Sequence, residues 1–87
     1  MKITITNKKL APMGYGTWYT GTVDACWFQA KVYDQPSTFG IHEGRISKLL
    51  LRDEAGTIIA SYDREWERLP ATVAGLDFVQ ALLDYFA

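Results

Sequence analysis

Hydrophobic and polar residues alternate along the first two thirds of the chain, a pattern typical of β-strands with one buried face. Residues 2–6 alternate polar and β-branched side chains and predict a short strand. Residues 7–16 contain a proline and two glycines and predict a loop, so residues 1–16 are interpreted as an N-terminal strand and loop arm. Residues 17–33 are predicted to form a β-hairpin with a two-residue turn at Asp24-Ala25.

The register of this hairpin follows from requiring the alternation to agree on both strands. One face is then small and apolar, and the opposite face collects aromatic, polar and charged residues. The apolar face pairs Val23 with Cys26, Gly21 with Phe28, Tyr19 with Ala30 and Thr17 with Val32. The opposite face pairs Thr22 with Trp27, Thr20 with Gln29 and Trp18 with Lys31.

A second hairpin is predicted after the loop of residues 34–44. Its first strand, residues 45–52, is apolar on both faces and is expected at the centre of the sheet. Its partner is residues 57–62, and residues 63–70 form a charged connection. From Thr72, the predicted N-cap, the spacing becomes helical. The expected buried stripe of this helix consists of Val73, Leu76, Val79, Leu83 and Phe86.

These elements predict a single α+β domain over residues 1–87. An antiparallel β-sheet of four to five strands, with two hairpins in residues 17–62, packs on one C-terminal α-helix at residues 72–86. The helix is expected to cover the apolar face of the first hairpin. Since one helix covers one face, the face with Trp18 and Trp27 has no obvious cover. Unless the N-terminal arm folds over it, this open face is available to a partner.

Composition narrows the class of protein. With 48% hydrophobic residues among 87, the chain is a folding sequence, and its twelve aromatic residues exceed what one small core is expected to bury. Surplus aromatic rings favour an interface, so a homo-oligomer is expected. The net charge of −1 gives no electropositive footprint for general DNA binding. One cysteine excludes an internal disulfide and no apolar stretch predicts a membrane span, so we expect a cytoplasmic protein.

Candidate catalytic residues are few. Cys26, the only cysteine, falls on the predicted core face, and His42, the only histidine, lies in a loop without a second metal ligand at useful spacing. A nucleophile pair of Ser37 and His42 lacks any supporting elbow motif. Asp34 and Asp63 each follow a strand-ending tyrosine, where aspartate caps a turn more often than it acts as an acid or base. We therefore assign no catalytic residue, metal ligand or cofactor.

Residues suited to binding are better represented on the open face. Trp18 directly opposite Lys31 is an expected cation–π pair, and Trp27 and Tyr33 belong to the same region. Two indoles and a base on an uncovered sheet face suit stacking on a planar ligand or nucleobase. They suit a homodimer or a host-protein interface equally well.

A second group of candidates is basic. Arg45 and Lys48 follow the glycine-containing loop, and Arg64 lies in the next connection, so together they can hold a phosphate or a carboxylate. The alternative is that they are solvated charges at the margin of a strand. The full set of predicted binding residues is Trp18, Trp27, Lys31, Tyr33, Arg45, Lys48, Arg64 and Trp66.

Several short motifs in order resemble a family of small uncharacterised proteins of bacteriophages, prophages and other bacterial mobile elements. The matching runs are Phe28–Ser37, Phe39–Ile41, Gly44–Leu49 and Tyr62–Arg64. The resemblance covers residues 18–86 and leaves residues 1–16 outside. This chain departs from the family pattern at Asp24-Ala25 and at Glu65, where the family tends to have glycine.

The resemblance carries no activity, but it implies a context. Small phage-type accessory proteins often counter host defence in the bacterial cytoplasm, by blocking a protein effector or by sequestering a nucleotide immune signal. This context is an association by origin and not a consequence of the fold.

Three functions therefore stay open. The first is a non-enzymatic module that captures a small anionic ligand, such as a nucleotide immune signal, at an oligomer interface. The second is a protein-blocking inhibitor of a host defence effector, of a CRISPR system for example, which uses the same open face. The third and weakest is a small hydrolase acting through His42, Asp34 or Asp63. The sequence favours binding over catalysis and does not choose between the first two.

Overall fold

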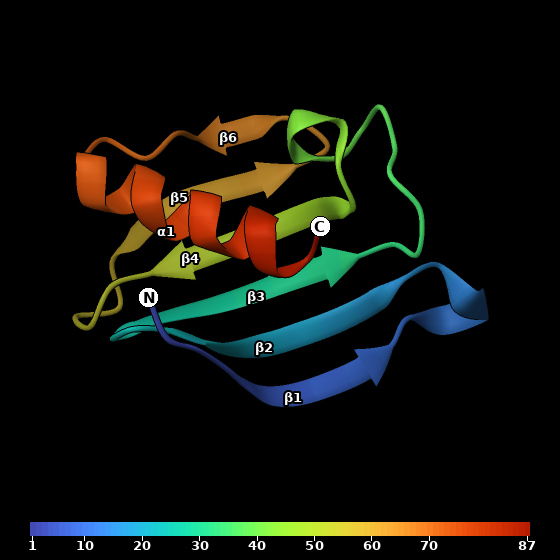
Figure 1. The fold of residues 1–87 in the computed structure, drawn as a ribbon, viewed down its shortest axis with the longest axis horizontal. Helices are drawn as coiled ribbons and strands as arrows, with labels where there is room; N and C mark the ends of the chain where they lie inside the picture. Colours follow the sequence, from blue (N-terminus) through green and yellow to red (C-terminus); the bar gives the residue numbers. More distant parts are fainter.

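Six strands and one α-helix make up the computed structural model, which describes residues 1–87. The strands are β1 Ile3–Leu10, β2 Thr17–Val23, β3 Cys26–Val32, β4 Ile46–Arg52, β5 Ile58–Asp63 and β6 Trp66–Arg68. The helix α1 is Val73–Tyr85, and the 3₁₀ helices are η1 Pro12–Gly14 and η2 Ile41–Glu43. The sheet is an antiparallel meander in the order β1-β2-β3-β4-β5-β6 (Figure 1).

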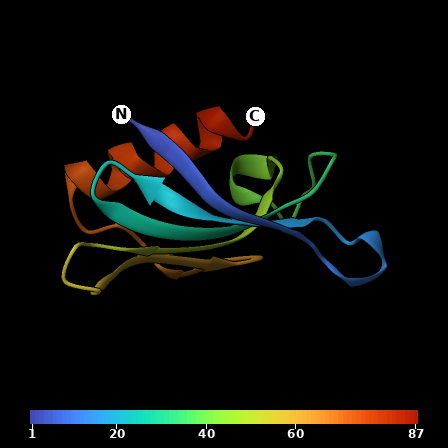
Figure 2. The ribbon, with the colours of Figure 1, turned by 90° about the horizontal axis from the view of Figure 1, so that it is seen from below.

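The fold class is the predicted one, an antiparallel sheet with a single C-terminal helix. In Figure 1 the helix α1 lies over the middle of the sheet, and Figure 2 shows α1 and the β3–β4 connection on the same side. The first hairpin has the predicted register, from Val23 opposite Cys26 at the turn to Thr17 opposite Val32. The period-two alternation was therefore sufficient to assign both faces of β2 and β3.

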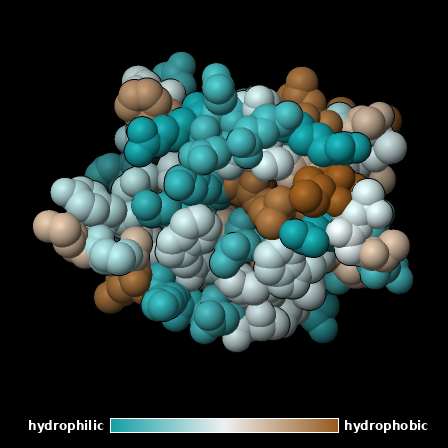
Figure 3. Space-filling model, turned by 180° about the vertical axis from the view of Figure 1, so that it is seen from behind, coloured by the Kyte–Doolittle hydropathy of each residue, from teal (hydrophilic) through white to brown (hydrophobic).

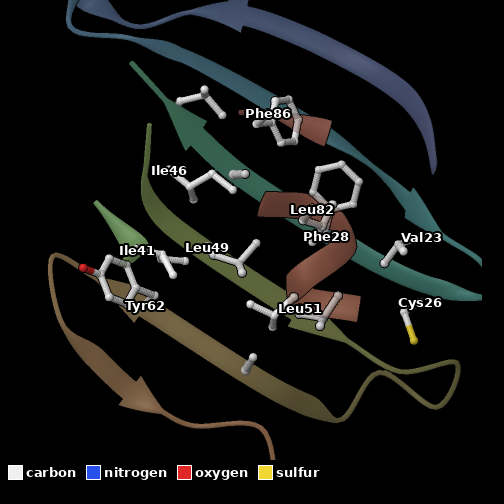
Figure 4. Close-up of a cluster of buried hydrophobic side chains, with 14 residues drawn as sticks. Val23, Cys26, Phe28, Ile41, Ile46, Leu49, Leu51, Tyr62, Leu82 and Phe86 are labelled. Carbon is white, nitrogen blue, oxygen red and sulfur yellow. The ribbon is translucent and has the colours of Figure 1, made fainter. Parts of the chain in front are cut away.

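The apolar face of the sheet is the one that α1 covers, as expected. Fourteen buried side chains from β2 to β5, η2, α1 and its C-cap form one cluster (Figure 4). Phe28, Leu51 and Leu82 have no exposed surface at its centre. Burying a side chain of this size stabilises the fold by about 1.5–3 kcal/mol, so this cluster is the main source of stability.

The predicted buried stripe of the helix was wrong in part. Val73 and Leu76 are 75% and 54% exposed. The residues that face the sheet are Gly75, Val79, Leu82 and Phe86. These residues are four, three and four positions apart, so they lie on one side of the helix, which faces the core. The predicted stripe began with Val73 and Leu76, which lie on a neighbouring side.

Gly75 is buried in the first turn of the helix. A Cβ at Gly75 would lie 3.1 Å from the Cβ of Pro70, so the small residue lets the first turn pack closely against the preceding segment. Thr72 is the N-cap, as predicted, because its hydroxyl accepts a hydrogen bond from the Gly75 amide at 3.0 Å.

The sheet has six strands instead of four to five. The structure differs from the prediction at the two edges of the sheet, where β1 is longer than expected and β6 is an additional strand. β1 does not end at residue 6 but continues to Leu10, with a register shift between Ile5 and Asn7. Residues 7–10 lack a buried face because they belong to an edge strand, and their polar sequence resembled a loop. β6 lies within residues 63–70, which were expected to be a connection; three residues are too few for a periodic signal.

The N-terminal arm, which contains β1, was the candidate to cover the open face. It extends the sheet beside β2 and does not fold over the open face. Its start braces the first turn, because the Lys2 amide donates to the Asp24 carboxylate and the Asp24 amide donates to the Lys2 carbonyl, both at 2.8 Å. Asp24 has φ of 50°, a left-handed conformation that aspartate tolerates better than most residues, so the turn forms without glycine.

Ionisation of two buried side chains links this core to pH. Burial raises the pKa of the Cys26 thiol above its ordinary value of 9.0, and the carboxylates of Asp53, Glu54 and Asp24 add to the effect. Burial, followed by the charge of Glu65, raises the pKa of the Tyr62 hydroxyl above its ordinary value of 10.0.

We expect the free energy of unfolding to fall as the pH rises above about 9. In the unfolded chain Cys26 ionises at its ordinary pKa, while in the folded chain it keeps its proton, so the stability present below pH 9.0 is lost above it. Urea unfolding of wild type and Cys26→Ala at neutral and alkaline pH measures this. The variant should lose the part of the decrease that begins near pH 9.0 and keep the later part due to Tyr62. A decrease of equal size at the same pH in both proteins would contradict the assignment.

Candidate functional site

The face of the sheet opposite α1 has no covering element. Cross-strand partners point to the same side, so the register places side chains on this face in rows. One row consists of Lys9, Trp18, Lys31, Lys48 and Asp63. A parallel row at the other end consists of Thr4, Thr22, Trp27 and Arg52. Figure 3 shows this uncovered face as a mainly hydrophilic surface with a hydrophobic patch.

Two lysines face each other in the first row. Lys31 is the direct cross-strand partner of Lys48, and like charges in this position destabilise a sheet. Lys48 has one partner, the carboxylate of Asp63 at 3.7 Å, in the single salt bridge of the structure. Lys31 instead lies over the rings of Trp18 and Tyr33, 5.9 and 5.4 Å from their centroids. An anion between the two ammonium groups would relieve their repulsion.

A hollow of about 460 Å³ opens beside this pair of lysines, where β3 ends and β4 begins. The residues that line it are Tyr33, Asp34, Gln35, Ser37, Phe39, Ser47 and Arg64. The volume is in the range of pockets for small organic ligands. The Arg64 guanidinium lies 5.9 Å from the centroid of the Phe39 ring and has no carboxylate within salt-bridge distance. The pocket therefore combines two aromatic rings with an unpaired cation.

The loop that forms one wall of the pocket is fixed by hydrogen bonds. The Tyr62 hydroxyl donates to the Phe39 carbonyl at 2.7 Å, and the Phe39 amide donates to the Ser37 hydroxyl at 3.1 Å. Gly40 is required here because a Cβ would overlap the Gly44 carbonyl. These contacts hold the Phe39 backbone in place before any ligand arrives.

An irregularity in β4 forms the floor. Lys48 pairs with Lys31 but Ile46 pairs with Val32, so Ser47 is one extra residue opposite β3. Its hydroxyl donates to the Lys31 carbonyl at 3.3 Å. Bulges of this kind re-aim side chains and are frequent beside functional sites.

Arg64 adopts a backbone conformation that L-residues rarely adopt. Its φ is 63°, and its amide donates to the Ser47 carbonyl at 3.1 Å. Non-glycine residues in the left-handed region are held there by their surroundings, often at ligand sites. The left-handed residue of this turn is thus Arg64 and not Glu65.

Five of the predicted binding residues come together around the lysine pair and the pocket. They are Trp18, Lys31, Tyr33, Lys48 and Arg64. Trp27 lies on the same face but in the row at the other end, where the Arg52 guanidinium is 5.9 Å from its ring centroid.

The structure places the other two predicted residues away from this group. Arg45 donates from Nε to the Tyr33 carbonyl at 2.8 Å and from Nη1 to the Ala87 carbonyl at 3.3 Å, so it links the end of β3 to the C-terminal segment. Trp66 packs edge-to-face on Tyr62, with ring centroids 5.1 Å apart, beside the core cluster.

Sequence reasoning missed the pocket residues of the β3–β4 connection. Phe39 was quoted only as part of a motif, and Gln35 and Ser47 were not considered as binding residues. A signal was present: a loop with two glycines and an aromatic residue, Phe39, follows the predicted strand and its neighbouring Tyr33. What the pattern did not reveal was that this loop returns to face Arg64.

The groups considered for catalysis do not meet in the pocket. His42 is exposed on η2 and lines a different hollow, next to Leu83 and Phe86. Cys26 lies in the core, and Asp63 pairs with Lys48. Asp34 and Ser37 line the pocket, but His42 does not. No group of three or more histidine, cysteine or acidic side chains is placed to hold a metal ion, and no helix is both long and apolar enough to cross a bilayer.

Comparison with known proteins places the chain among uncharacterised domains. The family model described as "Domain of unknown function (DUF7678)" matches residues 17–87. No curated protein and no solved structure matches the chain. The matched region begins with β2, so it contains the lysine pair and the pocket but not β1.

Arg64→Gly and Arg64→Ala separate the backbone strain from the loss of the side chain. Both remove the guanidinium, but only glycine adopts φ near 63° without steric cost, so we expect the glycine variant to be more stable by about 1 kcal/mol. Urea unfolding followed by circular dichroism measures the difference. Equal stability of the two variants, or a more stable alanine variant, would contradict a left-handed Arg64.

Proposed function

The chain belongs to the DUF7678 family of domains of unknown function, and from the site we propose that it is a non-enzymatic binding protein that captures a small anionic ligand with a planar ring, such as a nucleotide. One observation carries this proposal. Two lysines face each other on the uncovered face, next to a pocket with two aromatic rings and an unpaired arginine. Local rules of stability are broken most often where a ligand supplies the missing interaction.

The arrangement suits each part of such a ligand. A planar ring would stack on Tyr33 or Phe39, and Arg64 would donate two parallel hydrogen bonds to phosphate oxygens. Further negative charge would be attracted to Lys31 and Lys48. The volume of about 460 Å³ accommodates a ligand of mononucleotide size.

The same geometry supports binding over catalysis. The pocket contains the Asp34 carboxylate and the Ser37 hydroxyl, but the hydroxyl accepts from the Phe39 amide and makes no hydrogen bond to a base. Cys26 lies in the core away from the pocket, and burial raises the pKa of its thiol further above neutral pH, which disfavours the nucleophilic thiolate.

The biological context is part of the proposal and rests on the resemblance alone. The protein would act as a phage-type accessory protein in the cytoplasm of a bacterial host, where it would counter defence by sequestering a nucleotide immune signal. A homo-oligomer would enclose the ligand further, since the pocket lies open at the end of the sheet.

A protein-blocking inhibitor of a host defence effector is the alternative. Trp18 and Trp27 favour it, because half-buried indoles on an uncovered face are typical anchors of protein interfaces. Such an inhibitor would not need the pocket. Retention of a host protein during purification, abolished by Trp27→Ala, would support this alternative.

Thermal unfolding with a panel of AMP, GMP, ADP, ATP and cyclic dinucleotides tests ligand capture. A ligand present at about a hundred times its Kd stabilises a protein by about 2.7 kcal/mol, so we expect a rise in Tm of several degrees with at least one member. Arg64→Gly should lose this rise while folding normally. Arg68→Ala, which removes an exposed arginine outside the pocket, should keep it.

Two outcomes would reject the proposal. In the first, no member of the panel changes the Tm of the wild type. In the second, a nucleotide does so, but Arg64→Gly responds as strongly as the wild type, which would place the ligand elsewhere.

A further inference from the structure

The uncovered face carries a second aromatic residue with its own cation, far from the pocket. The Arg52 guanidinium lies 5.9 Å from the centroid of the Trp27 ring. The Lys31 ammonium group lies at the same distance, 5.9 Å, from the Trp18 ring. Both indoles are half-buried and remain open to solvent on one side of the sheet. Trp27 and Arg52 take no part in the pocket, so the ligand capture described above leaves them without a role.

Charge on this face differs from the charge of the whole chain. The cations of the rows are Lys9, Lys31, Lys48 and Arg52. On strands β1 to β4 no carboxylate shares the face with them; Asp63 on β5 is the first along the row. The chain as a whole has a net charge of −1, and two of its acidic residues, Asp63 on β5 and Glu67 on β6, stand at the other end of the sheet. The part of the face formed by β1 to β4 is therefore locally electropositive on a slightly acidic protein.

We propose that this face binds single-stranded nucleic acid, with one base stacked on Trp18 and another on Trp27. Trp27 pairs with Thr22, four residues from Trp18, so a rise of about 3.3 Å per residue and a strand spacing of about 4.8 Å place the two tryptophan Cα atoms about 14 Å apart. A strand lying along β2 and β3 passes over both indoles. Its phosphates then meet the four cations, while Gln29 between the two rows offers an amide to a base edge.

Other occupants fit the same face less well. A second copy packed face to face would place lysines and arginines against lysines and arginines, because a two-fold interface pairs a patch with itself. Duplex DNA hides the base faces that indoles need, and four cations are a small footprint for it. A protein partner would have to be acidic to match the cations in both rows, and charged residues are depleted in the core of protein interfaces.

Fluorescence anisotropy with labelled ten-nucleotide oligothymidylate and oligouridylate tests the proposal on the full chain at low salt. We expect the logarithm of the association constant to fall linearly with the logarithm of the salt concentration. The slope should lie between about −2 and −3, because three to four phosphate contacts are expected. Intrinsic tryptophan emission should be quenched on binding. Trp27→Ala should weaken binding at least about fivefold, and Trp27→Tyr, which keeps a stacking ring, should restore most of it.

Matched controls separate this site from the pocket and from a loss of folding. Tyr85→Ala removes an exposed ring on α1 and should bind the oligonucleotide as the wild type does. Trp27→Ala should keep the nucleotide-induced rise in Tm that depends on Arg64, so failure of one proposal leaves the other standing. Arg52→Gln offers a second test if Trp27→Ala unfolds, and it should reduce the salt slope by about 0.7.

Three results of the oligonucleotide experiments would overturn the inference. They are the absence of binding at low salt, duplex DNA competing as well as the single strand, and unchanged affinity in both Trp27→Ala and Arg52→Gln. Retention of an acidic host protein that the oligonucleotide does not displace would also reject it, in favour of a protein partner.

Discussion

One helix of 13 residues packed on a six-stranded sheet is the constraint on which the rest of the structure depends. Through Val79, Leu82 and the C-cap Phe86 it closes the only extensive core, and it has no counterpart on the other side of the sheet. A sheet with two exposed faces would not be stable, but a sheet with one covered face is. The fold therefore obtains its stability from one face of the sheet and leaves the other face without a covering element.

The uncovered face and the adjacent pocket contain two features that are unfavourable for the stability of the fold. Lys31 opposite Lys48 costs stability in the absence of a ligand, and Arg64 occupies a left-handed conformation at the edge of the pocket. The surroundings maintain both: the loop anchored by Tyr62 and Gly40 holds the pocket wall, and the extra residue Ser47 sets the floor. Met13, Asp24, His42 and Glu43 are left-handed as well, and Arg64 is the one of these five residues that lines the pocket.

Much of this could be predicted from the sequence, and the failures have physical reasons. The register of β2 and β3 followed from alternation on both strands, and the helix start followed from Thr72. The helix stripe was misplaced because the apolar Val73 and Leu76 are exposed, whereas the buried Gly75 carries no hydrophobic signal. β6 was missed because three residues carry no periodicity. The contact between Phe39 and Arg64 in the pocket joins segments that are distant in sequence, and a local sequence pattern does not predict such contacts.

The measurement that tests the central claim most directly is an NMR titration of ¹⁵N-labelled protein with ADP. A pocket formed by Tyr33, Phe39 and Arg64 next to two lysines predicts saturable amide shifts in residues 31–39, in Ser47 and Lys48, and in Arg64, while the amides of α1 stay unchanged. Shifts confined to α1 or to the hollow beside His42, or no shifts at all at millimolar ADP, would contradict the claim that this end of the uncovered face is an anion-binding site.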